Sequence, residues 1–124
     1  MQAVSDYRRT LRQLTIRDDA FVERVMSSEA TNLARSGLDA KTHAMVRLAA
    51  LVAMGAAEPS YRQVVHAALE AGATVDEVVG TLVAVMPLTG APRAVAAAPA
   101  VGLGLGYDVQ DALEGIEFIE GRGF

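Results

Sequence analysis

Two stretches of sequence decide the fold: LDAKTHAMVRLAALVAM at residues 38–54 and YRQVVHAALEAGATVDE at residues 61–77. In the first, Asp39 is a residue type that commonly caps a helix, and apolar residues follow it at helical spacing as far as Met54. From Met45 onward the predicted helix is apolar on nearly all sides, so we expect neighbouring helices to bury most of its circumference.

The second stretch predicts a helical hairpin. Pro59 fits the first turn of a helix, where its missing N–H costs nothing, and Gly72 fits the left-handed position that ends one. Thr74 and Glu77 have the spacing of a capping box, in which each side chain accepts the main-chain N–H of the other. A further helix is therefore expected after Thr74, and Pro87 should end or kink it. Its expected core-facing residues are Val78, Val79, Leu82, Val83 and Met86.

Helical periodicity also precedes these stretches, and no segment has the alternation of a strand ladder. Residues 4–14 predict a short basic helix. Asp18 or Asp19 can cap a second helix, and Ser36 and Gly37 close that region.

After the hairpin, Pro92 begins a last long segment that runs to about Leu105. Residues 115–124 alternate apolar and acidic residues between glycines, which predicts either a floppy tail or an extended arm laid on a neighbour. We expect one all-α domain over residues 1–124, with a basic helix in residues 1–17 and an acidic tail in residues 108–124. These oppositely charged termini are either solvated or docked against each other.

Composition bounds the class of protein. The chain has 124 residues, of which 52% are apolar, and a small helical domain cannot hide that much apolar surface within one subunit. We therefore expect a homo-oligomer. No apolar run reaches the roughly 18 uninterrupted residues of a bilayer span, and the first residues are polar, so we expect a cytoplasmic protein with no membrane partner.

Several kinds of chemistry are excluded. The absence of cysteine removes disulfides, thiolate metal sites and thiol redox cycles. The net charge of −4, without a basic stripe, argues against nucleic acid as a partner. With two histidines far apart, we predict no metal site, and no cofactor.

Together with Thr89-Gly90-Ala91-Pro92, the two stretches resemble the carboxymuconolactone decarboxylase family, which also contains the alkylhydroperoxidase D-like proteins. The resemblance covers about residues 33–107 and rests on the order and spacing of capping and packing signals. It implies an alkylhydroperoxidase D-like helical bundle that assembles as a symmetric homo-oligomer, a trimer or a hexamer.

The resemblance also implies where the chemistry of this family would lie. In the peroxidase-like branch a Cys-x-x-Cys pair would fall at Ala57 and Ser60, and a histidine at Val64, so we reject thiol peroxidase activity. In the decarboxylase branch the same histidine position is Val64, and an arginine position is His43. Val64 supplies neither a cation nor a proton, so we do not expect the decarboxylation reaction itself.

Four residues remain candidates for a pocket. His43 and Arg47 share one face of the central helix, where they form either a polar seam or subunit contact, or part of a pocket for an anionic or carbonyl ligand. The Tyr61 hydroxyl could orient a ligand or simply pack. His66 belongs to an i, i+4, i+8 row with Arg62 and Glu70, which is either a salt-bridged stripe or part of a site.

Two functional hypotheses stay open. The first is a cofactor-free lyase or acid–base enzyme, or a binder, that acts on a small organic acid or lactone. The second is a catalytically inactive oligomeric scaffold that works through its surface. Whether the chain is an enzyme is uncertain, because the usual catalytic positions are replaced at Ala57, Ser60 and Val64.

Overall fold

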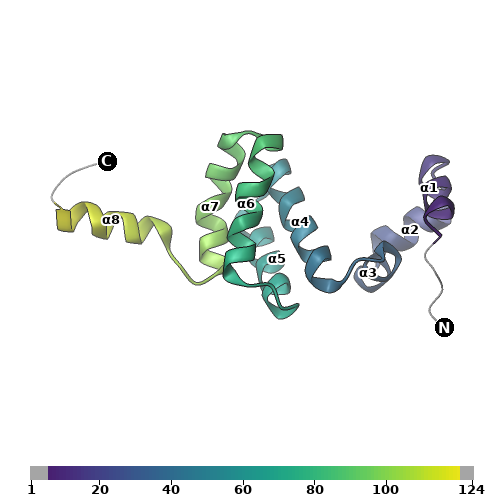
Figure 1. The fold of residues 1–124 in the computed structure, drawn as a ribbon, viewed down its shortest axis with the longest axis horizontal. Coiled ribbons are helices and arrows are strands. Elements are labelled where there is room, and N and C mark those ends of the chain that lie inside the picture. Colours follow the sequence, from purple (N-terminus) through teal and green to yellow (C-terminus); the bar gives the residue numbers. More distant parts are fainter. Residues whose placement is uncertain (1–5, 121–124) are drawn as a thin grey trace. The chain divides into compact units, whose positions relative to one another are not determined.

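A computed structural model describes the backbone of residues 6–120 and the side chains of residues 6–115. Within the described residues there are eight α-helices and no strand, which confirms the all-α class (Figure 1). The chain divides into two compact units, residues 1–39 and residues 40–124. The helices are α1 Tyr7–Thr15, α2 Asp19–Ser27, α3 Glu29–Ser36, α4 Ala40–Met54, α5 Glu58–Glu70, α6 Val75–Thr89, α7 Ala91–Gly104 and α8 Val109–Glu120.

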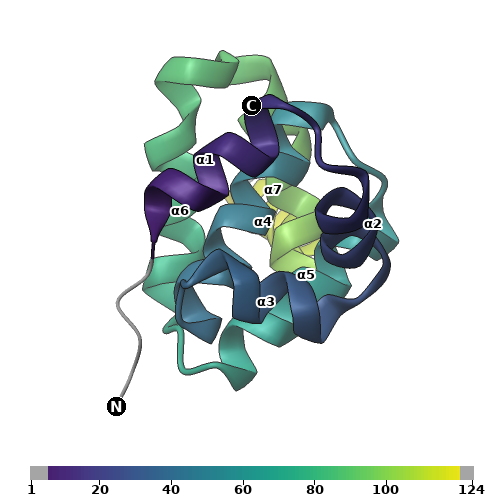
Figure 2. The same cartoon turned by 90° about the vertical axis from the view of Figure 1, so that its right-hand side faces the viewer.

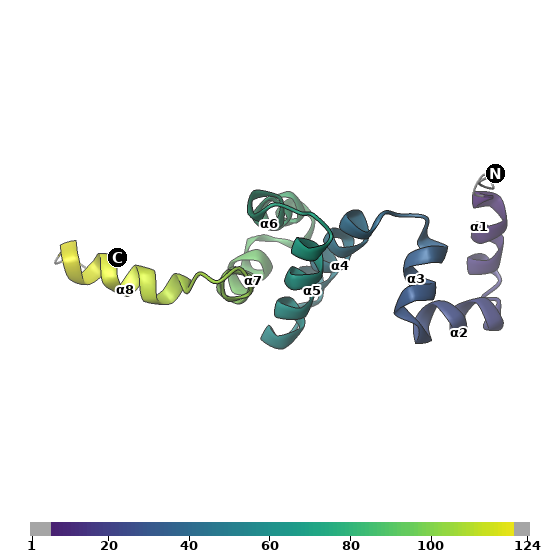
Figure 3. The same ribbon diagram turned by 90° about the horizontal axis from the view of Figure 1, so that it is seen from below.

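The first unit consists of three short helices with side-chain caps (Figure 2). Asp18 caps α2 by accepting the N–H of Phe21 over 3.1 Å, as predicted. Between Asp18 and Ser36 the chain forms two helices, because Ser28 is extended and its hydroxyl accepts the N–H of Thr31 over 3.2 Å. As a result α2 runs across the ends of α1 and α3 (Figure 3).

The second unit contains the main core. α4 packs against α5 and α6, and α7 packs against the same two helices (Figure 1). One stripe of α4 is buried, formed by Ala44, Leu48 and Val52 at intervals of four residues. The expectation that neighbours would bury most of α4 was wrong within this unit, because Val46 and Met54 are exposed. The other buried core residues are Tyr61, Val65, Ala68, Ala73, Val78, Leu82, Ala97 and Val101.

The predicted hairpin of α5 and α6 is confirmed at its turn. Gly72 has φ +99°, and the N–H of Ala73 reaches back to the carbonyl of Ala68 over 2.9 Å. The Thr74 hydroxyl accepts the N–H of Glu77 over 3.0 Å, and the Glu77 carboxylate accepts the N–H of Thr74 over 2.8 Å. This carboxylate also pairs with Lys41 over 3.0 Å, so it ties the start of α6 to α4.

Of two expectations for α6, one is answered in part and one was wrong. The helix does not end at Pro87 but continues to Thr89, so a kink at Pro87 stays a prediction. Val79 and Val83 are exposed, because the stripe that faces the core is formed by Val78 and Leu82. α6 is apolar over a wider arc than its neighbours in this unit cover.

The last long segment begins and ends close to the predicted residues. α7 spans Ala91–Gly104, with Pro99 inside it. The tail expected to be floppy or extended is instead helical as far as Glu120, and Asp108 accepts the N–H of Asp111 over 3.0 Å at its start. Residues 121–124 lie outside the described part of the chain. No helix among the described residues combines the length and apolar character that crossing a bilayer requires.

Candidate functional site

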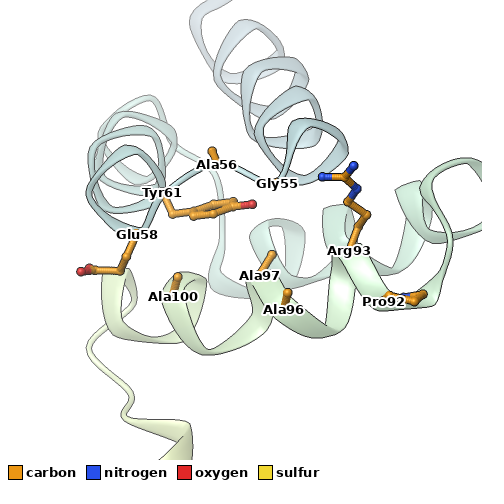
Figure 4. Close-up of a pocket in the computed structure, with 9 residues that line it drawn as sticks. All are labelled: Gly55, Ala56, Glu58, Tyr61, Pro92, Arg93, Ala96, Ala97 and Ala100. Atoms are coloured by element: carbon orange, nitrogen blue, oxygen red, sulfur yellow. The ribbon is translucent and has the colours of Figure 1, made fainter.

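A cavity of about 320 Å³ lies where the end of α4, the start of α5 and α7 as far as Ala100 meet (Figure 4). Alanine side chains of α7 form an apolar wall, and one tyrosine, one arginine and one glutamate supply polar groups. The lining residues are Gly55, Ala56, Glu58, Tyr61, Pro92, Arg93, Ala96, Ala97 and Ala100. A mostly apolar pocket with a few polar groups is the common form of a small-molecule site.

The end of α4 forms one side of the cavity. Gly55 adopts φ +67°, and its N–H donates to the carbonyl of Val52 over 3.2 Å. The N–H of Ala56 donates to the carbonyl of Leu51 over 3.1 Å. This pair of hydrogen bonds is a Schellman motif, which turns the chain sharply from α4 toward α5.

Tyr61 stands between the cavity and the core. Only 3% of its surface is exposed, and its hydroxyl donates to the carbonyl of Leu51 over 3.1 Å. Burial raises the pKa of the phenol, while a main-chain hydrogen bond from Ala56 and the charge of Arg93 act in the opposite direction. Tyr61 is therefore neutral near pH 7. Its proton is donated to the carbonyl of Leu51, and beside the hydrogen bond from Ala56 one lone pair of its oxygen remains for a ligand.

Arg93 is the cation of this cavity. It is the one charged residue of α7, and no hydrogen bond or ion pair to its guanidinium occurs among the described residues. The negative charge of Glu58 is matched by Arg62, whose Nη2 lies 2.6 Å from the carboxylate. In Figure 4 the Arg93 guanidinium and the Tyr61 hydroxyl point toward the same region of the cavity.

Sequence reasoning missed Arg93. The sequence did contain a signal, because Arg93 is a single charge in an otherwise apolar, alanine-rich segment, and such an isolated charge can mark a binding site. What the sequence does not show is that α7 places this residue beside the end of α4, which lies far from it along the chain.

The four predicted pocket residues occupy different places. Tyr61 lines the cavity, whereas His66 lies on the exposed face of α5, in a separate depression of about 420 Å³ with Arg62. His43 and Arg47 are half-buried on α4 and do not line the cavity. Arg47 precedes the end of α4 by seven residues, which is roughly 10 Å along the helix axis. The ligand-binding roles of His43, Arg47 and His66 stay predictions.

The positions that the family resemblance singled out lie on the first turns of α5. Ala57 precedes the helix without a side-chain cap, and Ser60 and Val64 are half-buried beside Tyr61. None of the three carries a thiol or an imidazole. These three positions therefore have no group for thiol chemistry.

Comparison with known proteins gives one match. Residues 19–102, more than half of the chain, match the family model described as carboxymuconolactone decarboxylase family. This match begins before the region on which the resemblance rested and includes α2 and α3. No curated protein and no solved structure matches the chain.

Proposed function

The chain belongs to the carboxymuconolactone decarboxylase family, and on that premise we propose that it binds a small organic acid or lactone in the cavity between α4, α5 and α7. Family membership supports the helical architecture, and the side chains of the cavity support the class of ligand. The lack of cysteine argues against a thiol peroxidase.

The observation that carries this proposal is the guanidinium of Arg93, which lines an apolar cavity and has no ion-pair partner among residues 6–115. A planar guanidinium can hold both oxygens of a carboxylate at once. The alanine wall, formed by Ala96, Ala97 and Ala100, suits the hydrocarbon part of such a ligand. The Tyr61 oxygen can accept a hydrogen bond from a hydroxyl group of the same molecule.

An acid–base reaction on the bound acid would depend on Glu58 or Tyr61, the other two ionisable side chains of the lining. Glu58 is engaged by Arg62, and the Tyr61 proton is engaged by Leu51. Because both groups are already engaged within the protein, the cavity is better suited to binding an acid than to transferring a proton to or from it.

The proposal is tested by measuring the affinity for benzoate and for benzamide, its neutral counterpart, by isothermal titration calorimetry. We expect benzoate to bind more tightly than benzamide. Arg93→Gln should weaken benzoate binding by about tenfold or more, since hydrogen bonds to charged groups contribute about 1.5–3 kcal/mol. Arg24→Gln, which removes the same charge from the exposed surface of α2, is the matched control and should change nothing. Equal affinity of the wild type and Arg93→Gln for benzoate would refute the proposal.

A second function, an oligomeric scaffold, is favoured by the exposed apolar side chains of α6. Val83 and Leu88 are 62% and 89% exposed, and Val79 lies on the same side of the helix as Val83. We propose that copies of the chain cover this surface in a homo-oligomer, a trimer or a hexamer.

The two functions are distinguished by one pair of variants. Val83→Asp should lower the mass measured by sedimentation and leave benzoate affinity unchanged. Arg93→Gln should weaken benzoate binding and leave the mass unchanged. A monomeric wild-type protein at micromolar concentration would refute the scaffold.

A further inference from the structure

We infer that Gly55 is a positioning residue for Arg93: the missing side chain at position 55 leaves the space in which the guanidinium lies, against the C-terminal end of α4. This inference deepens the proposed function and rests on it for its meaning. It names a residue that decides where the cation of the site is held, without itself forming a polar contact with a ligand.

The steric observation separates Gly55 from the other helix-ending glycines. α4, α5 and α7 all end in the same motif, with Gly55, Gly72 and Gly106 at φ +67°, +99° and +85°. A Cβ built at Gly72 or Gly106 has no atom within 4 Å. A Cβ at Gly55 would collide with Nη1 of Arg93 and lie 3.6 Å from its Cζ (Figure 4). The left-handed backbone is common to all three glycines, whereas the need to leave space for an arginine applies to Gly55.

The partial negative charge at the C-terminal end of α4 attracts the guanidinium of Arg93. The last carbonyl groups of a helix carry partial negative charge, and α4 has no basic residue in its own last turn. Arg93, supplied by α7, brings a positive charge to that end from outside the helix. Attraction to the carbonyl groups limits the positions of an otherwise mobile side chain.

A guanidinium already held in place loses less conformational freedom when a carboxylate binds. Ordering a long side chain costs roughly 0.5–1.5 kcal/mol, which corresponds to about a twofold to tenfold change in affinity. A methyl group at position 55 should displace the guanidinium cheaply, because its far end is flexible. The displacement therefore appears in ligand affinity and in side-chain order more than in folding stability.

The first experiment needs no ligand. The ¹H–¹⁵N heteronuclear NOE of the Arg93 side-chain Nε–H is measured by NMR in the wild type, in Gly55→Ala and in Gly106→Ala. We expect an ordered Arg93 in the wild type and in Gly106→Ala, and a mobile one in Gly55→Ala. Arg24, an exposed arginine, gives the reference for a mobile side chain. If Gly55→Ala does not fold, the wild type still decides: an Arg93 as mobile as Arg24 overturns the inference.

The second experiment measures benzoate affinity of the same proteins. Gly55→Ala should bind benzoate about twofold to tenfold more weakly than the wild type, and Gly106→Ala should bind it as tightly as the wild type. Equal weakening by both substitutions would overturn the inference, because strain in the backbone would then explain the loss. Failure of the wild type to bind benzoate would refute the proposed function alone, since the NMR result on Arg93 order stands without any ligand.

Discussion

The hydroxyl of Tyr61 and the N–H of Ala56 both donate to the carbonyl oxygen of Leu51, each over 3.1 Å. One oxygen near the end of α4 thus receives the hydrogen bond that ends the helix and the hydrogen bond that fixes the aromatic wall of the cavity. The core and the candidate site are joined at this atom, so substitutions at Tyr61 should be felt in both.

Tyr61→Phe should lower the free energy of unfolding by about 1 kcal/mol, the usual net contribution of one hydrogen bond and below the cost of leaving a buried acceptor without a donor. The loss is small because the Leu51 oxygen keeps the N–H of Ala56 as a donor. Urea denaturation measures the change, and Tyr107→Phe, on an exposed ring, is the control with no expected effect. An unchanged midpoint for Tyr61→Phe would show that the hydrogen bond contributes nothing.

Alkaline pH should remove the stabilisation that Tyr61 provides. Burial raises the pKa of Tyr61 above its ordinary value of 10.0, so the folded state holds the phenolic proton more tightly than the unfolded state. Its contribution is complete below pH 10.0 and is lost as pH rises through the raised pKa of the folded state. The stability difference between wild type and Tyr61→Phe should therefore shrink as the pH rises above 10.0. A constant difference over this range would contradict the prediction.

Acid should weaken the junction between α4 and α6. The main-chain N–H of Thr74 and then the side chain of Lys41 hold the pKa of Glu77 below its ordinary value of 4.5. A lowered pKa gives stability that is present above pH 4.5 and is lost as pH falls through the pKa of the folded state. The melting temperature of Glu77→Gln should lie below that of the wild type near neutral pH and converge with it in acid. Glu70→Gln, on the exposed face of α5, should follow the wild type throughout.

Leu48→Ala should cost about 2–5 kcal/mol of folding stability, because Leu48 is fully buried at the centre of α4. Val46→Ala, on the exposed side of the same helix, should cost much less. Chemical denaturation measures the free energy of unfolding of both variants. The two values can be compared if the dependence of that free energy on denaturant concentration is the same as in the wild type. Similar losses at the two positions would mean that Val46 is also covered in solution.

Two glycines inside helices should respond in opposite directions to alanine. Gly80 in α6 has open space where a Cβ would lie, so Gly80→Ala should stabilise the fold by about 0.5–1 kcal/mol. At Gly104 a Cβ would lie 3.2 Å from Cβ of Val65, so Gly104→Ala should destabilise by about 1–3 kcal/mol through overpacking. Thermal unfolding curves of the two variants and the wild type, recorded at one protein concentration, show whether each substitution raises or lowers stability. A destabilising Gly80→Ala would indicate that another copy packs against that face of α6.

Much of the fold could be predicted because its signals are local. The cap at Asp18, the left-handed Gly72 and the capping box of Thr74 and Glu77 each involve residues within a few positions of one another. Stereochemistry fixes such contacts whatever the rest of the chain does.

The errors arose where a pattern depends on distant partners or on competing signals. The valines at positions 79 and 83 indicate that burial would be favourable, but the sequence does not show whether another helix covers them. Both residues are exposed. Ser28 caps α3 and so divides residues 19–36 into two helices, a division that the apolar spacing alone does not show. Arg93 could not be assigned to the site, because its place depends on how α7 packs beside the end of α4.

The shared Leu51 oxygen gives the cavity a built-in reporter. Deuterium uptake at the Ala56 amide requires the hydrogen bond to that oxygen to open, and Tyr61, which lines the cavity, donates to the same oxygen. A molecule that occupies the cavity and holds this corner shut should slow exchange at that one amide, even where the global stability of the protein barely changes.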